Sequence, residues 1–302
     1  MRQEPPKTWA HHSLYQRVRD ALFAAPLYFK SEINIIGVRA TDIFTLNSSL
    51  GAAIEEQVVT TLNQIRTIWD PERQYADYSF VRRSQAFPDV ILQRRQWIGD
   101  TDDPMPIILG IELKGWYLLA KEDEPSFRFK VTPAACNLQD LIAIYPWVLS
   151  QIISGSPRCL RPFVESARYA AEYRNYWWQH VRESEGDKRI DPPASAIPYP
   201  KKSDLISDEP RSDSGRNFGR FARTGIMDSY LADIAREPLC GIEARYWRDF
   251  FKVFREGSTA EVIERAMESV KIQIRDGYQG SSEEDIQALM GKLLEMAKMI
   301  MR

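Results

Sequence analysis

Residues 87–116 of this chain read FPDVILQRRQWIGDTDDPMPIILGIELKGW, and the two apolar stretches in this segment predict two strands joined by a polar loop. The first strand is expected over residues 87–92 and contains Asp89. The second is expected over residues 107–114 and ends in Glu112 and Lys114. Because side chains alternate between the two faces of a strand, Glu112 and Lys114 point the same way. If the two strands are neighbours, two carboxylates and one ammonium meet at one place.

These three side chains predict a site that acts on phosphodiesters with the help of a metal ion. Two carboxylates repel each other at close range unless a hard cation lies between them. A divalent cation with a lysine beside it suits the in-line hydrolysis of a phosphodiester. The stretch between Asp89 and Glu112 has the length of a hairpin of two strands and a loop. On these residues alone an alternative stays open, in which Asp89 is a turn residue and Glu112 and Lys114 form a solvated pair at a sheet edge.

Length, charge and cysteine content narrow the class of protein. The chain has 302 residues and a formal net charge of -2. It can therefore bury a full core, but it is not basic enough to coat nucleic acid non-specifically. A local basic cleft is compatible with this charge. The three cysteines, Cys136, Cys159 and Cys240, form no CxxC pair, which indicates reduced thiols in a cytoplasmic protein.

Several common motifs are absent from the sequence. The longest apolar run, residues 141–149, contains Pro146 and is too short to cross a bilayer as a helix. There is no Gly-x4-Gly-Lys-Ser/Thr loop, so we expect no nucleotide cofactor. No His-x3-His pair or cysteine cluster offers a zinc site. We therefore expect no membrane segment, no nucleotide-driven motor and no zinc centre.

Hydrophobic periodicity predicts helices and strands along the whole chain. Strands are expected at residues 33–38, 78–81, 87–92, 107–114 and 141–149. The last of these is expected to be buried on both faces, although periodicity alone does not separate it from a helix. Helices are expected at residues 13–25, 50–68, 162–181, 225–236, 243–256, 259–275 and 282–301. Expected helix caps are Ser13, Ser48 or Ser49, and Thr132, and expected loops are residues 99–106 and 121–125.

The expected helix over residues 50–68 carries a further candidate for the site. Its apolar stripe is Leu50, Ile54, Val58, Leu62 and Ile65. Glu55 lies beside this stripe, in the pattern Gly51-x-x-x-Glu55, from which a third carboxylate could reach the cation. The alternative is an exposed glutamate in the first turn, where the helix dipole favours negative charge.

At these residues the chain resembles the PD-(D/E)XK nuclease superfamily and, more narrowly, type II restriction endonucleases. The resemblance covers residues 48–150 and is carried by Pro88-Asp89, Glu112-Leu113-Lys114 and Glu55. It implies an α/β fold with a restriction-endonuclease-like core, in which helices flank a central mixed sheet. By this resemblance Asp89 and Glu112 bind Mg²⁺ with the backbone carbonyl of Leu113, and Glu55 completes the metal site or holds its waters. Lys114 orients or deprotonates the attacking water. One departure is the short helix expected between the third and fourth strands of this core.

Composition divides the chain into three parts. Residues 1–183 are expected to form the nuclease core with its N-terminal helices. Residues 184–224 are rich in Pro, Ser, Asp and Lys and are expected to form an irregular segment that could read DNA. Residues 225–302 are expected to form a mainly helical C-terminal region.

Arginines near the expected site and in the irregular segment are candidates for DNA contact. The candidates for reading bases or gripping phosphates are Arg216, Asn217, Arg220 and Arg223, because Arg can fork onto guanine and Asn onto adenine. Those that flank the strands and are expected to grip phosphates are Arg82, Arg83, Arg94 and Arg95. The alternative for the irregular segment is a solvated basic loop.

Together these features predict a magnesium-dependent, sequence-specific endonuclease that cuts double-stranded DNA and works as a cytoplasmic homodimer. Two-fold symmetry supplies the two active sites that a symmetric double-strand cut requires. The alternatives are a structure-selective or repair nuclease on the same core, a catalytically inactive DNA-binding protein on that fold, and an RNA nuclease.

Overall fold

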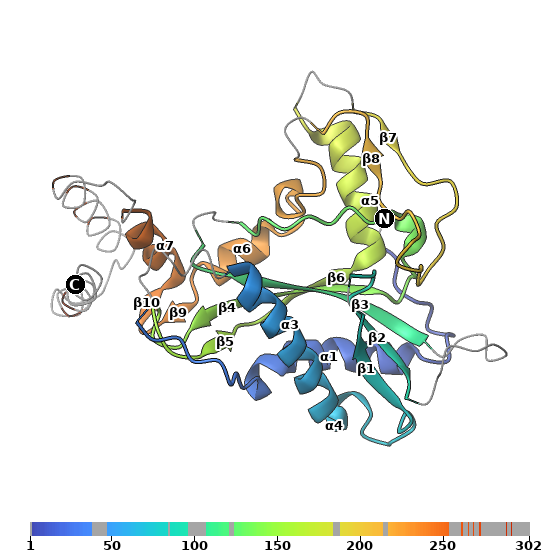
Figure 1. Ribbon diagram of the computed structural model, residues 1–302, viewed down its shortest axis with the longest axis horizontal. Coiled ribbons are helices and arrows are strands. Elements are labelled where there is room, and N and C mark those ends of the chain that lie inside the picture. Colours follow the sequence, from blue (N-terminus) through green and yellow to red (C-terminus); the bar gives the residue numbers. More distant parts are fainter. Residues whose placement is uncertain are drawn as a thin grey trace.

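A curled six-stranded mixed sheet runs through the middle of the computed structural model (Figure 1). The structure describes residues 2–37, 47–83, 85–95, 107–120, 124–183, 188–213 and 217–253, together with single positions at 261, 265, 268, 272, 288 and 291. The strands are β1 (Tyr78–Arg82), β2 (Val90–Arg94), β3 (Ile107–Tyr117), β4 (Leu141–Leu149), β5 (Pro157–Cys159) and β6 (Phe163–Ser166). Helices cover both faces of this sheet, so the fold is mixed α/β.

The order of the strands places β3 and β4 at the centre of the sheet. β1 pairs with β2 and β2 with β3, both antiparallel. β3 then runs parallel to β4, and β4 pairs antiparallel with both β5 and β6. All nine residues of β4 are buried, which confirms a strand covered on both faces. Its apolar sequence LIAIYPWVL leaves no polar face for water.

The helices of the first part of the chain lie on one face of the sheet and α5 lies on the other (Figure 1). Those on the first face are α1 (His12–Tyr28), α3 (Asn47–Gln64) and α4 (Arg66–Trp69). α5 (Ala167–Tyr176) continues into a π-helical turn, Trp177–Val181. The later elements are β7 (Ile190–Asp191), β8 (Glu209–Pro210), α6 (Asp228–Ile234), β9 (Pro238–Leu239), β10 (Ile242–Glu243) and α7 (Ala244–Val253). Short 3-10 turns lie at Pro133–Ala135 and Ala222–Thr224.

The buried stripe of α3 packs against the sheet as the periodicity predicts. Leu50, Ile54, Val58, Leu62 and Ile65 are all at most 8% exposed. Gly115 of β3 allows an unusually close approach to Gly51 at the start of this helix. A Cβ atom added to Gly115 of β3 would lie 3.1 Å from the Gly51 Cα atom. The backbones of α3 and β3 are therefore in direct contact at this point.

Several expected boundaries and caps are wrong. β2 begins at Val90, so residues 87–89 precede the strand. Residues 163–166 form β6 and not the start of a helix. Ser13 lies inside α1, and Ser48 and Ser49 lie inside α3. The long helix expected to residue 68 is divided at Ile65 into α3 and α4, and the side chain of Thr132 makes no capping hydrogen bond.

Other expectations are met in part or fall outside the described residues. The expected strand at residues 33–38 is reduced to a single bridge from Ile35 to Gly155. The loop at 99–106, residues 121–123 of the next loop, and most of the two last expected helices lie outside the described part. All three cysteines are free thiols. In the part of the chain that the structure describes, no helix is long and apolar enough to span a membrane.

The irregular segment after α5 is tied to the sheet domain by backbone hydrogen bonds and by a buried ion pair. Thr132 donates its N–H to Ile206, and Phe129 donates to Gly219. Arg174 of α5 is 1% exposed. It donates to the carbonyls of Phe129 and Val131 and forms an ion pair of 2.6 Å with Asp208. These contacts fix the segment against α5. One buried apolar cluster extends from Leu14 in α1 to Phe251 in α7.

Candidate active site

The Asp89 and Glu112 carboxylates meet at the ammonium group of Lys114. Lys114 Nζ lies 2.8 Å from Asp89 Oδ2 and 2.8 Å from Glu112 Oε1. The register of β2 on β3 explains this meeting, because Val90 lies opposite Ile111 and the preceding residue, Asp89, therefore lies near Glu112. The structure thus brings together three side chains that are distant in sequence.

Backbone hydrogen bonds fix the two carboxylates in place. Asp89 Oδ2 accepts the N–H of Leu113 at 3.2 Å, and Glu112 Oε2 accepts the N–H of Asp89 at 3.3 Å. Each acidic residue therefore receives a hydrogen bond from the segment that carries the other. The side chains of Lys114 and Asp89 are 22% and 23% exposed and that of Glu112 is 10% exposed, so the group lies at the edge of the core with access to solvent.

Burial and neighbouring charges shift the pKa values of Glu112 and Lys114. Burial raises the pKa of Glu112 to about 7, Lys114 works against this shift, and Asp89 adds to it. Burial lowers the pKa of Lys114, but Glu112 and Asp89 raise it by more, so the net pKa is above its ordinary value. In this arrangement Lys114 is a cation. Its ammonium lies between the two carboxylates and offsets their charge.

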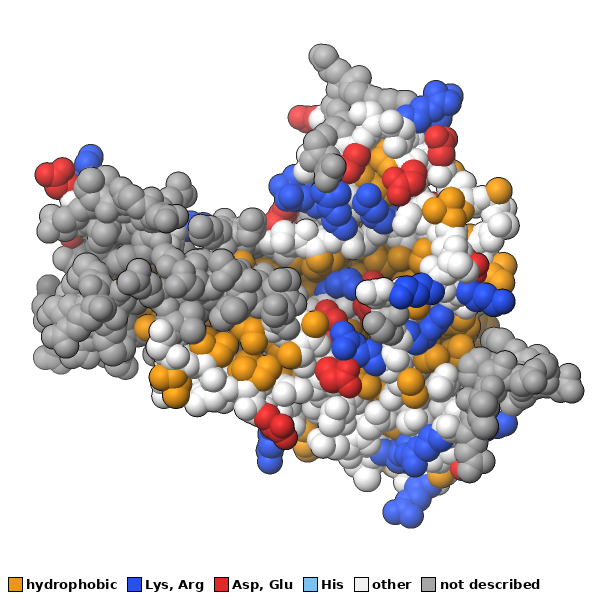
Figure 2. Space-filling model, viewed as in Figure 1, with side chains coloured by type: hydrophobic (Ala, Val, Ile, Leu, Met, Phe, Trp, Pro, Cys, Tyr) orange, Lys and Arg blue, Asp and Glu red, His pale blue; other side chains and the backbone are white. Residues whose placement is uncertain are grey.

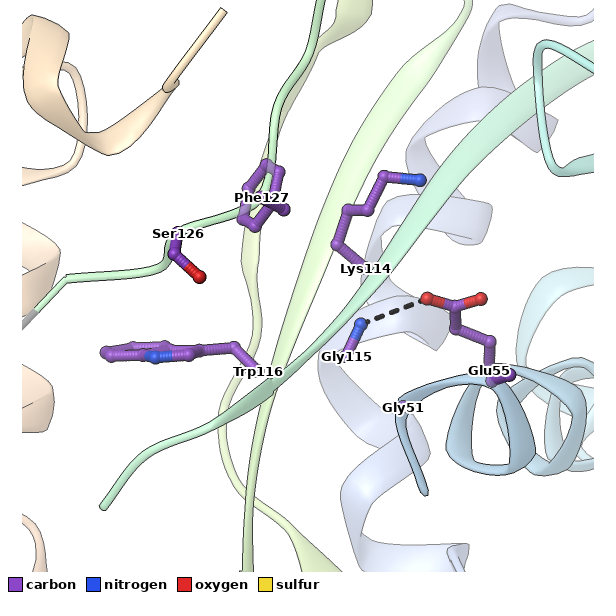
Figure 3. A pocket seen from close by; sticks show the side chains of 8 residues that line it. Gly51, Glu55, Lys114, Gly115, Trp116, Ser126 and Phe127 are labelled. Atoms are coloured by element: carbon purple, nitrogen blue, oxygen red, sulfur yellow. Dashed lines mark hydrogen bonds between the residues drawn. The ribbon is translucent and has the colours of Figure 1, made fainter. Parts of the chain in front are cut away.

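Glu55 approaches the same place from helix α3. Its carboxylate accepts the N–H of Gly115 at 3.2 Å (Figure 3) and lies 3.6 Å from Arg82 Nη2. Burial raises the pKa of Glu55, whereas Lys114 lowers it and Asp89 raises it. The close contact of Gly51 with Gly115 brings α3 near enough for Glu55, one turn further on, to reach β3.

A pocket of about 320 Å³ begins at Glu55 and Lys114 and extends along β3. Trp116, Ser126 and Phe127 line its other end (Figure 3). Glu112, Lys114 and Trp116 occupy alternate positions of β3 and so share one face of the strand. Lys114 therefore joins the carboxylate site to a space that is polar at the Glu55 end and aromatic at the other.

The residues present fit a divalent cation only with a rearrangement. Among the described residues, no group of three or more His, Cys, Asp or Glu side chains is gathered closely enough to enclose a metal ion. Asp89 and Glu112 already surround one cationic group, the ammonium of Lys114, whereas Glu55 is held by Gly115 and Arg82. A metal ion at the two carboxylates must displace Lys114 and take its other ligands from backbone and water. Mg²⁺ accepts such a site because it keeps several of its waters.

The arginines expected to flank the site differ in their surroundings. Arg82 contacts Glu56 at 3.0 Å as well as Glu55. Arg83 donates to two carbonyls, those of Phe87 and Pro200, so this arrangement does not present it to a phosphate. Arg94 lies over the ring of Tyr78. Arg94 and Arg95 are exposed at the end of β2 that is further from Asp89.

The candidates in the irregular segment are only partly described. Arg216 lies outside the described residues. Arg223 is exposed and forms hydrogen bonds to Glu124 and to Asn217. Arg220 is half-buried and bridges through its backbone to Arg128. Lys and Arg side chains gather near β3 and, across an uncharged band, on the part of the molecule that carries α5 (Figure 2).

Sequence reasoning missed a buried aspartate behind the site. Asp140 is 0% exposed, and burial raises its pKa to about 7. Its carboxylate accepts the N–H of Gly110 at 2.8 Å, that of Asn137 at 2.7 Å and the hydroxyl of Tyr199 at 3.1 Å. The only signal in the sequence was its position directly before the longest apolar run. Such a residue is easily taken for a loop aspartate.

Comparison with known proteins places the chain in no family. No protein-family model, no curated protein and no solved structure matches the chain.

Proposed function

We propose that the protein is a magnesium-dependent DNA endonuclease of the PD-(D/E)XK type. The observation that carries this proposal is the meeting of Asp89 and Glu112 at one cationic position, with Lys114 between them. The order of elements from α3 through β1, β2 and β3 to the 3-10 turn and β4 also resembles the core of this superfamily. The finer assignment, a type II restriction enzyme acting on double-stranded DNA as a homodimer, is part of the proposal.

Each site residue has a defined task in this proposal. Asp89 and Glu112 would hold Mg²⁺ through their carboxylates, with the backbone carbonyl of Leu113 as a further ligand. The ion would act as a Lewis acid that neutralises charge on the phosphate oxygens and lowers the pKa of a bound water. Lys114, displaced from the carboxylates, places its ammonium beside the attacked phosphate and the attacking water and stabilises their negative charge. Glu55 is one turn of α3 from Gly51 and orients water at the edge of the site.

The position of Lys114 also favours a second candidate, a DNA-binding protein on the same fold without catalysis. Its ammonium already neutralises both carboxylates, so the folded state satisfies these charges without a metal ion. The two candidates differ in one respect that can be measured. A nuclease must exchange this ammonium for a divalent ion, and a binding protein need not.

Digestion of mixed plasmids tests the proposal. The purified protein is incubated with supercoiled plasmids in Mg²⁺ and, as a control, in EDTA, and the cut ends are mapped. Discrete fragments that appear only with Mg²⁺ support a sequence-specific endonuclease. A metal-dependent smear favours a structure-selective or repair nuclease of the same core. Absence of any cleavage, together with intact binding to the same plasmids, favours the non-catalytic DNA-binding protein.

A further inference from the structure

The turn that carries Asp89 is held from both sides by residues outside the two strands. Arg83 donates its backbone N–H to the carbonyl of Asp89 at 2.6 Å, and its Nη1 atom donates to the carbonyl of Phe87 at 2.9 Å. Its Nη2 atom donates to the carbonyl of Pro200 at 2.8 Å. A single guanidinium thus links the Phe87–Asp89 turn to the irregular segment after α5.

A second link from this segment runs through Asp140. The neighbouring residue Tyr199 donates its hydroxyl to Asp140, and Asp140 in turn accepts the N–H of Gly110. Gly110 lies two residues before Glu112 and directly beneath the proline of the turn. A Cβ atom at Gly110 would lie 2.2 Å from Pro88 Cγ. Tyr199 therefore contacts Asp140, which holds the backbone of β3 near Glu112. Pro200 contacts Arg83, which holds the turn that carries Asp89.

The backbone at this point is held in an uncommon conformation. Tyr199 has a φ of 52°, in the left-handed region that costs a non-glycine residue about 1 kcal/mol. Such a conformation persists where surrounding contacts determine it, and the contacts here are the hydrogen bonds of Tyr199 and Pro200. The same irregular segment continues to Asn217 and Arg223, which are candidates for DNA contact.

We propose that Arg83 and Tyr199 are positioning residues that hold the Asp89 turn and the Gly110 backbone in register, and so connect the DNA-facing segment to the metal-binding carboxylates. The proposal rests on the proposed nuclease function for its effect on cleavage. It replaces the phosphate contact expected of Arg83, because both Nη atoms already have backbone acceptors. A lysine keeps the positive charge but lacks the planar fork whose two Nη atoms reach the carbonyls of Phe87 and Pro200.

The variants Arg83→Lys and Tyr199→Phe test the proposal, with Arg158→Lys as the matched control because Arg158 is exposed in β5 and has no part in the proposed site. Three quantities are measured: amide hydrogen exchange of the peptides that contain Asp89 and Leu113, the KM and kcat of cleavage, and DNA affinity in Ca²⁺. We expect exchange to rise at least about 10-fold in both test variants and kcat to fall about 10-fold, with KM, DNA affinity and Tm close to wild type. Arg158→Lys is expected to leave exchange and kcat unchanged.

Unchanged exchange in both test variants would overturn the proposal. So would an Arg83→Lys protein that loses DNA affinity while kcat is kept, because this result would return Arg83 to a phosphate contact. A wild-type protein that cuts no DNA would contradict the proposed nuclease function instead. The exchange measurement would then still decide whether Arg83 and Tyr199 hold the turn, since it requires neither metal nor substrate.

Discussion

Lys114 Nζ lies 2.8 Å from Asp89 Oδ2, at the distance of a charged hydrogen bond. The lysine therefore occupies the position that a divalent ion needs if Asp89 is to be a metal ligand. Ion and ammonium compete for the same oxygen atoms. Because of this competition, removing the lysine should raise the affinity of the site for a divalent ion and lower the rate of cleavage.

The variant Lys114→Met is expected to bind Mn²⁺ more tightly than wild type at pH 8 and to lose cleavage. Without the ammonium, a divalent ion meets no competing cation at the two carboxylates. Because Lys114 lowers the pKa of Glu112, its removal raises that pKa, and the ion must displace a proton from Glu112 when it binds. Under the proposed mechanism the variant also loses the positive charge beside the attacked phosphate, which is expected to lower kcat by about 10²–10³-fold. Isothermal titration with Mn²⁺ and single-turnover cleavage are the two measurements. Weaker Mn²⁺ binding in this variant would mean that Lys114 supports the metal site and does not compete with it.

Metal affinity should depend on pH through Glu112, whose pKa burial raises to about 7. Below that pH Glu112 is protonated and neutral, and a neutral carboxyl group is a poor ligand for a hard cation. Mn²⁺ affinity is therefore expected to rise as pH increases from 5 to 7 and to level off above about 8. The variant Glu112→Gln should bind Mn²⁺ weakly at every pH. A wild-type affinity that stays constant from pH 5 to 8 would argue against Glu112 as a ligand.

The contact between α3 and β3 predicts unequal effects for two glycine substitutions. A Cβ atom at Gly115 would lie 3.1 Å and 3.2 Å from the Gly51 backbone, which cannot yield as a flexible side chain does. Gly115→Ala is therefore expected to lower the free energy of unfolding by about 1–3 kcal/mol. It should also separate Glu55 from the Gly115 N–H.

Gly51→Ala is the matched control for that substitution. Its Cβ atom would meet only the Gly115 carbonyl oxygen, at 3.9 Å, and alanine is favoured over glycine inside a helix by about 0.5–1 kcal/mol. We expect equal or slightly greater stability than wild type in urea unfolding. If both alanine variants lose stability equally, the close packing of the two backbones is not as described.

Gly110→Ala should shift the turn that carries Asp89, because Gly110 packs against Pro88. The added Cβ would overlap Pro88 and approach Asp140 Oδ1 to 3.0 Å, so the turn that carries Asp89 must shift. We expect a loss of stability of about 1–3 kcal/mol and a fall in Mn²⁺ affinity of at least about 10-fold. Calorimetric unfolding and Mn²⁺ titration measure the two effects. A protein with reduced stability but unchanged Mn²⁺ affinity would show that this packing does not position the carboxylate.

The central sheet and the convergence of the site were accessible from sequence because their signals are local. The stripe of α3 and the continuous apolar run of β4 follow directly from burial on one face and on two faces. Alternation along β3 placed Glu112 and Lys114 on one side. Asp89 was placed near them by the length of the intervening chain.

Other features depend on long-range contacts that leave no local pattern. β6 was mistaken for helix because its four residues precede a long aromatic helix and pair only with the distant β4. Arg83 seemed available for phosphate, but its acceptor at Pro200 is 117 positions away. Asp140 resembles a loop residue until Gly110 and Tyr199 are placed around it. In each case tertiary packing determines the role of the residue.

The most direct test of a metal site at Asp89 and Glu112 is to measure Mn²⁺ binding to wild type and to Asp89→Asn by electron paramagnetic resonance at pH 8. Asparagine keeps the size of the side chain and removes its charge, so folding should be preserved and can be checked by Tm. We predict saturable binding of Mn²⁺ to wild type and an affinity lowered more than about 100-fold in Asp89→Asn, with loss of cleavage in parallel. Equal Mn²⁺ affinity in the two proteins would contradict a metal site built on Asp89 and Glu112.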